Sequence, residues 1–224
     1  MGIDKEGFCS VIMEGRGLPA KAAFPDSFSY GNEAVETVSY DPEGAKKLLE
    51  ESGWKDTDGD GYADKDGQKL TIDWLTYPTR LEQPKLAEYA QATLKEIGID
   101  VVVNNTSDHM TYAADGNFDV YVSSTTTAPT GDPEYFFTST VVGPKNYGKY
   151  ENKEVTALTE KLHQAFEPEE RAKLATELQQ KILDDDGFFF VSHLNMGIVT
   201  KSNVKGMAAH PCDYYEITAD LDVE

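Results

Sequence analysis

The most specific chemical signal in this sequence is an Asp- and Gly-rich segment at residues 56–64. It reads Asp56-Thr57-Asp58-Gly59-Asp60-Gly61-Tyr62-Ala63-Asp64. Alternating carboxylates, a glycine at the sixth position and a backbone carbonyl at the seventh are the pattern of a calcium loop. The pattern predicts a structural Ca²⁺ held by Asp56, Asp58, Asp60 and Asp64. The twelfth position, where such loops carry a bidentate glutamate, is Gly67, with Asp66 one residue earlier. A metal-free turn is the alternative that these residue types favour.

A second segment, residues 123–133, is rich in hydroxyl groups. It reads Ser-Ser-Thr-Thr-Thr-Ala-Pro-Thr-Gly-Asp-Pro and follows a predicted strand. Two prolines and a glycine restrict its backbone. A rigid polar loop after a strand is a common place for ligand contacts. The segment therefore predicts a ligand-facing loop, and an ordinary polar connector is the alternative.

Signatures of catalysis are missing from the sequence. It has no G-x-S-x-G, H-E-x-x-H, G-x-x-x-x-G-K-[ST] or G-x-G-x-x-G motif. The four histidines are His109, His163, His193 and His210. His163 is expected at a helix surface. His193, in a predicted strand, is expected to be either a structural histidine or a ligand. Ser192 and His193 form no catalytic pair, because adjacent strand residues point to opposite faces. We therefore expect no enzyme.

The composition excludes other classes of function. There are 20 Lys and Arg against 40 Asp and Glu, which gives a net charge of −20. Binding to nucleic acid or to an anionic membrane needs clustered basic residues, so neither is expected. No run approaches the ~20 apolar residues of a membrane span. The start, Met1-Gly2-Ile3-Asp4, does not resemble a signal peptide. The chain is therefore expected to be cytosolic or a piece of a longer protein.

The elements that position these segments follow from periodicity and capping signals. Helices are expected over Ile3–Met13, from Asp41-Pro42-Glu43 to Gly53, from about Pro84 to Gly98, from Asn152 to Phe166, and from Glu167-Pro168 onward. The helix after Asp41 is expected to bury a stripe of Ala45, Leu48 and Leu49, and the helix after Asn152 a stripe of Val155, Leu158, Leu162, Ala165 and Phe166. Strands are expected over residues 70–75, 99–103 and 118–122, with one or two more within 188–200. The alternation of strands and helices predicts an α/β fold with a mostly parallel sheet. Ligands bind beyond the carboxyl ends of such strands, here after Val122 and around Tyr77. Cys9 and Cys212 have no metal or redox spacing, and we expect two buried thiols, with a disulfide as the alternative.

The order of several short motifs resembles the extracytoplasmic solute-binding proteins of peptide and nickel ABC importers, solute-binding family 5. The motifs are Ile3-Asp4-Lys5-Glu6, Leu18-Pro19-Ala20, Tyr40-Asp41-Pro42-Glu43 with Ala45-Lys46-Lys47-Leu48-Leu49, Gly53-Trp54, Asp56–Gly61, Gly131-Asp132-Pro133 with Phe136, Asn146–Asn152 with Glu154-Val155, Glu169-Glu170-Arg171, and Asn203-Val204-Lys205-Gly206. They run over nearly the whole chain.

This resemblance implies a lobe of the type II periplasmic-binding-protein-like fold, with a mixed, mostly parallel sheet flanked by helices. Family members have two lobes. Residues 1–205 resemble the second ligand-binding lobe, and residues 206–224 resemble a tail that returns toward the first lobe, which is absent here. The parent would be extracytoplasmic, in the periplasm or lipid-anchored at the cell surface. It would deliver its ligand to the membrane subunits of an ABC transporter, without catalysis and without a required cofactor. Because the ligand sits between lobes, this chain would carry half of the site and bind weakly by itself.

The resemblance also ranks the cargo. Peptide-binding members carry an Asp a few residues before the Asp-Pro pair, and that position is Pro129 here. Ala128-Pro129 resembles nickel-binding members, which favours Ni²⁺ or a small nickel chelate, with di- or oligopeptides as the alternative. A calcium-stapled scaffold module and a small hydrolase rank below both. The expected ligand contacts are Thr125, Thr126, Thr127, Pro129, Thr130, Asp132, Lys145, Asn146 and Tyr147. The nickel members' aromatic pair is replaced by Thr126 and Thr130, and residues 141–146 contain no histidine. His193 or the chelator's own donors would then hold the metal.

Overall fold

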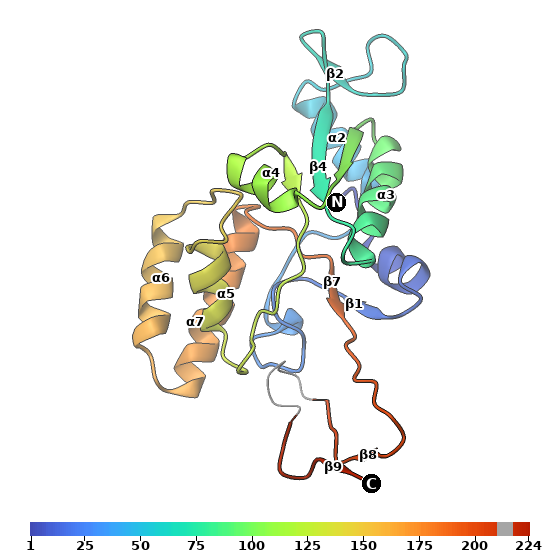
Figure 1. The fold of residues 1–224 in the computed structure, drawn as a ribbon. Coiled ribbons are helices and arrows are strands. Elements are labelled where there is room, and N and C mark those ends of the chain that lie inside the picture. Colours follow the sequence, from blue (N-terminus) through green and yellow to red (C-terminus); the bar gives the residue numbers. More distant parts are fainter. Residues whose placement is uncertain (210–216) are drawn as a thin grey trace. The chain divides into compact units, whose positions relative to one another are not determined.

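The chain divides into two compact units, which are described here one at a time (Figure 1). The computed structural model of this chain describes residues 1–209 and 217–224. Unit 1 contains residues 1–16 and 38–124, and unit 2 contains residues 17–37 and 125–224. The predicted lobe of residues 1–205 with a tail of residues 206–224 concerns the arrangement of a longer protein and stays a prediction. Cys212 and His210 lie outside the described residues.

Unit 1 is built on a three-stranded parallel sheet. Its strands are β4 (Thr71–Thr76), β5 (Asp100–Asn105) and β6 (Val120–Tyr121), in the order β5-β4-β6. Helix α3 (Glu82–Lys95) connects β4 to β5, and helix α4 (His109–Asp115) connects β5 to β6. Figure 1 shows α3 and α4 flanking β4. The expected α/β pattern and parallel sheet are confirmed for this unit.

Apolar periodicity explains why these segments pack together. Leu86, Ala90 and Leu94 lie on one face of α3 and are buried. The β-branched run of β5 packs against this helix, with Val101 2% exposed. The turn between them is held by Gly98, whose φ of +86° favours glycine. Helix and strand together form the unit's core.

The remaining elements of unit 1 are short. They are α1 (Lys5–Gly7), the π-helical turn η1 (Phe8–Ile12), α2 (Pro42–Glu51), and the hairpin of β2 (Asp64–Lys65) with β3 (Gln68–Lys69). Asp41 caps α2 as expected, since its side chain accepts the Gly44 N–H at 2.9 Å. The expected buried stripe on α2 is wrong. The helix contains no buried residue, and Leu48 is 52% exposed.

Unit 2 is mainly helical. Its elements are β1 (Gly17–Pro19), the 3₁₀ turn η2 (Asn32–Ala34), α5 (Glu134–Phe136), the π-helical turn η3 (Phe137–Val141), α6 (Lys153–Gln164), α7 (Pro168–Asp184), β7 (Ser192–Leu194), β8 (Val204–Lys205) and β9 (Asp222–Val223). β1 pairs with β7, and β8 pairs with β9, both antiparallel. Only residues 192–194 of the expected 188–200 strand region are extended and paired, so that prediction is largely wrong.

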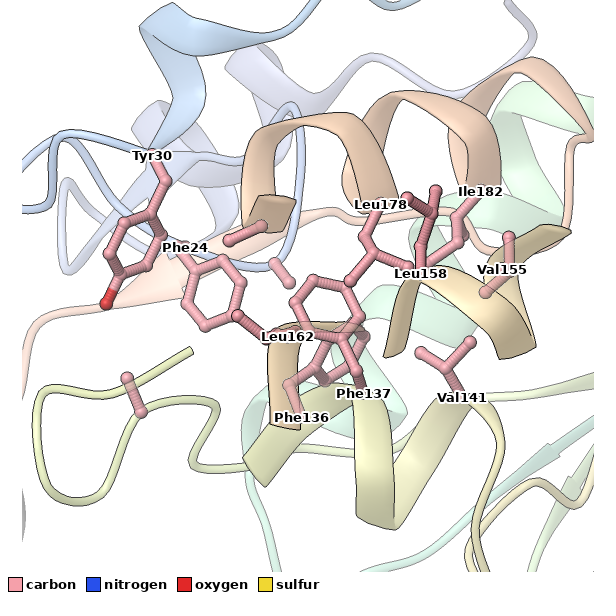
Figure 2. Close-up of a cluster of buried hydrophobic side chains, with 13 residues drawn as sticks. Phe24, Tyr30, Phe136, Phe137, Val141, Val155, Leu158, Leu162, Leu178 and Ile182 are labelled. Carbon is pink, nitrogen blue, oxygen red and sulfur yellow. The ribbon is translucent and has the colours of Figure 1, made fainter. Parts of the chain in front are cut away.

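One aromatic side chain from an irregular segment lies at the centre of the unit 2 core. Figure 2 shows Phe24 beside Phe136, Phe137 and Leu162. Phe24 is fully buried, and its ring centroid lies 5.0–6.4 Å from those of Phe28, Tyr30, Phe136 and Phe137. Residues 17–37 therefore belong to this core although they form little regular structure. Phe166 was expected in the α6 stripe, but it follows the end of the helix and is 88% exposed.

Within the described residues, no helix combines the length and the apolar character that a membrane crossing would need.

Two phenylalanines allow a matched test of this core. Replacing the fully buried Phe137 by alanine leaves a cavity and should lower the free energy of unfolding by about 3–5 kcal/mol. The exposed Phe166→Ala change should cost less than about 0.5 kcal/mol. Urea unfolding followed by circular dichroism measures both. Equal losses in the two variants would contradict the assignment of the core.

Candidate ligand-binding site

The hydroxyl-rich loop of unit 2 has a buried anchor and an exposed polar surface. Ala128 and Pro129 are buried, and Ala128 belongs to the hydrophobic core. Thr125, Thr126 and Thr130 are exposed, and Thr127 is half-buried. This arrangement holds the backbone of the loop while leaving three hydroxyl groups accessible to a ligand.

Asp132 has a different surrounding from the one expected of a ligand contact. Its carboxylate forms a bidentate pair with Arg171, at 2.9 Å from Nε and 2.7 Å from Nη2. Arg171 Nη2 also donates to Glu134 at 2.9 Å, and Nη1 donates to the carbonyls of Leu162 and Ala165 at 2.7 and 2.6 Å. The guanidinium thus joins the loop to the carboxyl end of α6. A ligand role for Asp132 stays a prediction, and a ligand there would have to share the carboxylate with Arg171.

Burial and the hydrogen bonds of this cluster shift the pKa values of Glu134 and Tyr30, among others. Burial raises the pKa of Glu134, but hydrogen bonds from His163 and Arg171 outweigh burial, so its pKa is lower than usual. Burial, reinforced by the negative charge of Asp132, raises the pKa of Tyr30 to about 12. The neutral Tyr30 hydroxyl donates to the Gly131 carbonyl at 2.8 Å. The loop is therefore held by charged and neutral hydrogen bonds.

The expected contacts at residues 145–147 lie in a turn of the same unit. Lys145 Nζ donates to the Tyr135 hydroxyl at 3.1 Å. The Asn146 side chain holds the turn, because it donates to the Tyr150 carbonyl and accepts the Tyr150 N–H at 2.8 and 2.9 Å. Tyr147 is half-buried. Lys145 and Tyr135 thus link this turn to the helix that follows Asp132-Pro133.

His193, the expected nickel ligand, takes part in a structural network. Its Nε2 lies 3.1 Å from Asn32 Oδ1. The same oxygen accepts the N–H groups of Lys21 and Ala22 at 2.9 and 3.3 Å. The β1–β7 pairing places His193 opposite Leu18. Metal coordination through Nε2 would require the loss of the Asn32 bond, and the nickel role of His193 stays a prediction.

The Asp-rich loop of unit 1 brings three of its four expected carboxylates together. Ligand oxygens of Asp56, Asp58 and Asp64 lie within 4.8 Å of one another. Asp60 instead pairs with Lys69 at 2.6 Å. Asp56 accepts the N–H groups of Gly59 and Gly61 at 2.6 and 3.0 Å, as in an Asp-stabilised turn. Part of the predicted calcium set is thus assembled, and one member is neutralised by a lysine.

A cluster at the carboxyl end of the unit 1 sheet contains His109, which was not predicted as a site residue. Tyr77 follows β4, and its ring stacks on His109 with centroids 4.1 Å apart. His109 Nδ1 lies 2.8 Å from the hydroxyl of Tyr121, the last residue of β6. The Tyr77 hydroxyl accepts the Ser124 N–H at 3.2 Å. The sequence pointed to the loops around Tyr77 and after Val122, but it did not connect His109 to them.

A family model described as "Bacterial extracellular solute-binding proteins, family 5 Middle" matches residues 1–148, and the chain belongs to this family. The chain is 28% identical over 223 residues to the oligopeptide-binding protein AppA of Bacillus subtilis, covering 96% of the chain and 41% of AppA. It is 27% identical over 225 residues to the nickel-binding protein NikA of Staphylococcus aureus, covering 99% of the chain and 44% of NikA.

Solved structures of both relatives match the chain equally well. AppA in complex with a nonapeptide gives a TM-score of 0.78 at 25% identity, covering 94% of this chain and 43% of AppA. S. aureus NikA in complex with Ni(L-His)₂ gives a TM-score of 0.78 at 25% identity, covering 99% of this chain and 46% of NikA. The expected type II periplasmic-binding-protein-like lobe is thereby confirmed. The chain spans less than half the length of these relatives. Both relatives are named for what they bind, an oligopeptide for AppA and nickel for NikA.

The Glu134 cluster predicts a pH dependence of stability. Because its folded-state pKa is lowered, its contribution is present above about pH 4.5 and is lost as the pH falls through the folded-state value. Glu134→Gln should flatten the fall in unfolding free energy between pH 7 and about pH 3. Glu154→Gln is the control, since Glu154 forms an exposed pair with Lys181. An unchanged profile in Glu134→Gln would contradict the stabilising role of this carboxylate.

The Asp-rich loop predicts a weak response to calcium. Since Lys69 occupies Asp60 and Gly67 stands at the twelfth position, ~1 mM Ca²⁺ should move the melting temperature by less than about 1 °C. Differential scanning fluorimetry with Ca²⁺ and with chelator measures this shift. A larger rise that Asp58→Asn abolishes would establish a calcium site instead.

Proposed function

We propose that this chain is part of the substrate-binding component of an ABC importer that captures nickel or a nickel chelate between two lobes. Residues 125–130 and 145–147 would contribute contacts from unit 2. Ni²⁺ would be the cargo rather than a resident cofactor. No covalent step is involved, and the transport cycle needs only reversible capture.

The arrangement of Asp132 is the observation that carries the choice of cargo. It is the one carboxylate in residues 123–133, and Arg171 binds both of its oxygens. Pro129 stands where peptide-binding members have an aspartate. A peptide with a free α-amino group needs an accessible anion for a charge-assisted hydrogen bond. The one carboxylate of this loop is already paired with Arg171, whereas a nickel chelate can be held by hydroxyl groups and one added donor.

The relatives support two cargo classes. The similarity to S. aureus NikA, whose structure holds Ni(L-His)₂, supports nickel. The similarity to AppA, whose structure holds a nonapeptide, supports di- or oligopeptides as the second candidate. The Haemophilus influenzae heme-binding protein A, at 26% identity, indicates how widely cargo varies among proteins of this kind.

The same proposal includes the rest of the parent protein. It would be extracytoplasmic and would dock on the membrane subunits of an ABC transporter. Residues 1–205 would form the second lobe, and residues 206–224 would return toward the first. Support comes from apolar side chains at the surface, since Val199 is 98%, Ile217 81% and Val223 64% exposed. A further lobe would cover such residues.

Isothermal titration separates the cargo classes. A longer protein with both lobes is titrated with Ni²⁺, with Ni²⁺ plus L-histidine, and with a dipeptide. We expect micromolar or tighter binding of the nickel chelate and no binding of the dipeptide, with this chain at least about tenfold weaker than the longer protein. Dipeptide binding without nickel binding would overturn the nickel assignment. Equally tight binding by this chain would overturn the two-lobe arrangement.

A further inference from the structure

We propose that His109 supplies the imidazole nitrogen that completes the coordination of a nickel chelate. This inference rests on the proposed nickel cargo and names the residue of this chain that contacts the metal. Nickel accepts an imidazole nitrogen as a ligand, and His109 offers one at the carboxyl end of the unit 1 sheet.

The position of His109 is the first argument. It begins α4, directly after β5, at the end of the sheet where β4 and β6 also end. Figure 1 shows α4 beside β4. In open parallel sheets, ligands bind beyond the carboxyl ends of the strands. His109 is half-buried, so it is held by the unit and still reaches its surface.

The orientation of the ring is the second argument. Tyr77 stacks on one face of the imidazole, with centroids 4.1 Å apart and planes inclined by 19°. Tyr121 Oη lies 2.8 Å from Nδ1. The Tyr121 hydroxyl donates to Met110 Sδ at 3.9 Å, which leaves its oxygen to accept Nδ1–H. The lone pair is then on Nε2, and no residue of the ranges 1–209 and 217–224 forms a hydrogen bond with that nitrogen. A fixed ring that donates through its other nitrogen is the usual form of a metal-binding histidine.

The support behind Tyr77 is the third argument. Tyr77 is 7% exposed, and its hydroxyl accepts the Ser124 N–H. Ser124 Oγ accepts from Gln83 Nε2 at 2.6 Å and donates to Glu82 at 2.9 Å. These bonds fix the ring on which His109 stacks. The site is therefore organised before any ligand arrives.

Buried polar atoms at this end of the sheet are the fourth argument. Thr76 Oγ1 and Gln83 Oε1 have no hydrogen-bond partner within the described part of the chain, although Thr76 is fully buried and Gln83 is 4% exposed. Buried polar atoms normally have partners. A bound molecule or water at this edge would supply them.

The other described histidines are engaged differently. His163 Nδ1 pairs with Glu134 at 2.6 Å, and its side chain is 71% exposed. His193 Nε2 lies 3.1 Å from Asn32. His109 combines an oriented ring with an Nε2 that no described residue occupies. We therefore rank it above His193 as the metal contact.

Histidine-ring ¹H–¹⁵N spectra of this chain test the proposal, because NMR also detects weak binding. The probe is Ni²⁺ with one equivalent of L-histidine, and paramagnetic broadening identifies the ring that contacts the metal. We expect the His109 signals to broaden at a chelate concentration about tenfold below that needed for His163 or His193. His109→Gln should abolish binding at the lower chelate concentration, so that the other histidine rings broaden only at the higher one. Tyr121→Phe keeps the imidazole but removes its orienting partner, and should raise the required concentration roughly tenfold.

His163→Gln is the matched control and should leave the His109 titration unchanged. Broadening of another ring before His109 would overturn the inference while nickel cargo stands. So would chelate binding, seen by titration calorimetry, that His109→Gln does not weaken. Failure of the chelate to bind either this chain or a longer two-lobed protein would instead overturn the proposed function itself.

Discussion

The arrangement of unit 2 depends on a single guanidinium group. The Arg171 side chain is 15% exposed, and a charge so far from water must be paired and hydrogen-bonded. Asp132 and Glu134 supply opposite charge, and the last carbonyls of α6 accept the remaining donors. Because the planar fork of arginine fixes these directions, it sets where the loop ends and where α5 begins. Lysine has no equivalent geometry. Tyr30 adds a neutral bond to the same loop at Gly131.

Different residues of the loop hold its backbone and face a ligand. Ala128, Pro129 and Asp132 hold the backbone, and the side chains of Thr125, Thr126 and Thr130 are at the surface. Unit 1 has the same division, with Tyr77 buried and His109 half-buried at the strand ends. Relatives with similar sequences have names that refer to oligopeptide, nickel or heme. A constant scaffold with a few variable side chains at loop ends accounts for such a range.

Local signals predicted much of the fold, and long-range partners explain what they missed. Asp41 and Asn152 cap helices as expected, because a cap needs only neighbouring N–H groups. The strand at residues 17–19 was missed, since its partner is residues 192–194. The apolar face of α2 was expected to be buried because its apolar residues recur at helical spacing. That spacing does not show whether another element covers the face. The role of Asp132 depends on Arg171, 39 residues later, and that of His109 on two tyrosines from different segments, Tyr77 and Tyr121. No local pattern encodes these pairings.

The pairing of β1 with β7 also determines an order of events as the chain emerges from its N-terminus. All residues of unit 1 are available once residue 124 has emerged, so its parallel sheet can form early. Residues 17–37 have by then been available for longer, but Leu18 must wait for His193, and Phe24 must wait for α7. Until then an aromatic-rich segment stays without its core. Exposed apolar surface of this kind is prone to aggregation and is bound by chaperones. Folding competes with aggregation until unit 2 is complete.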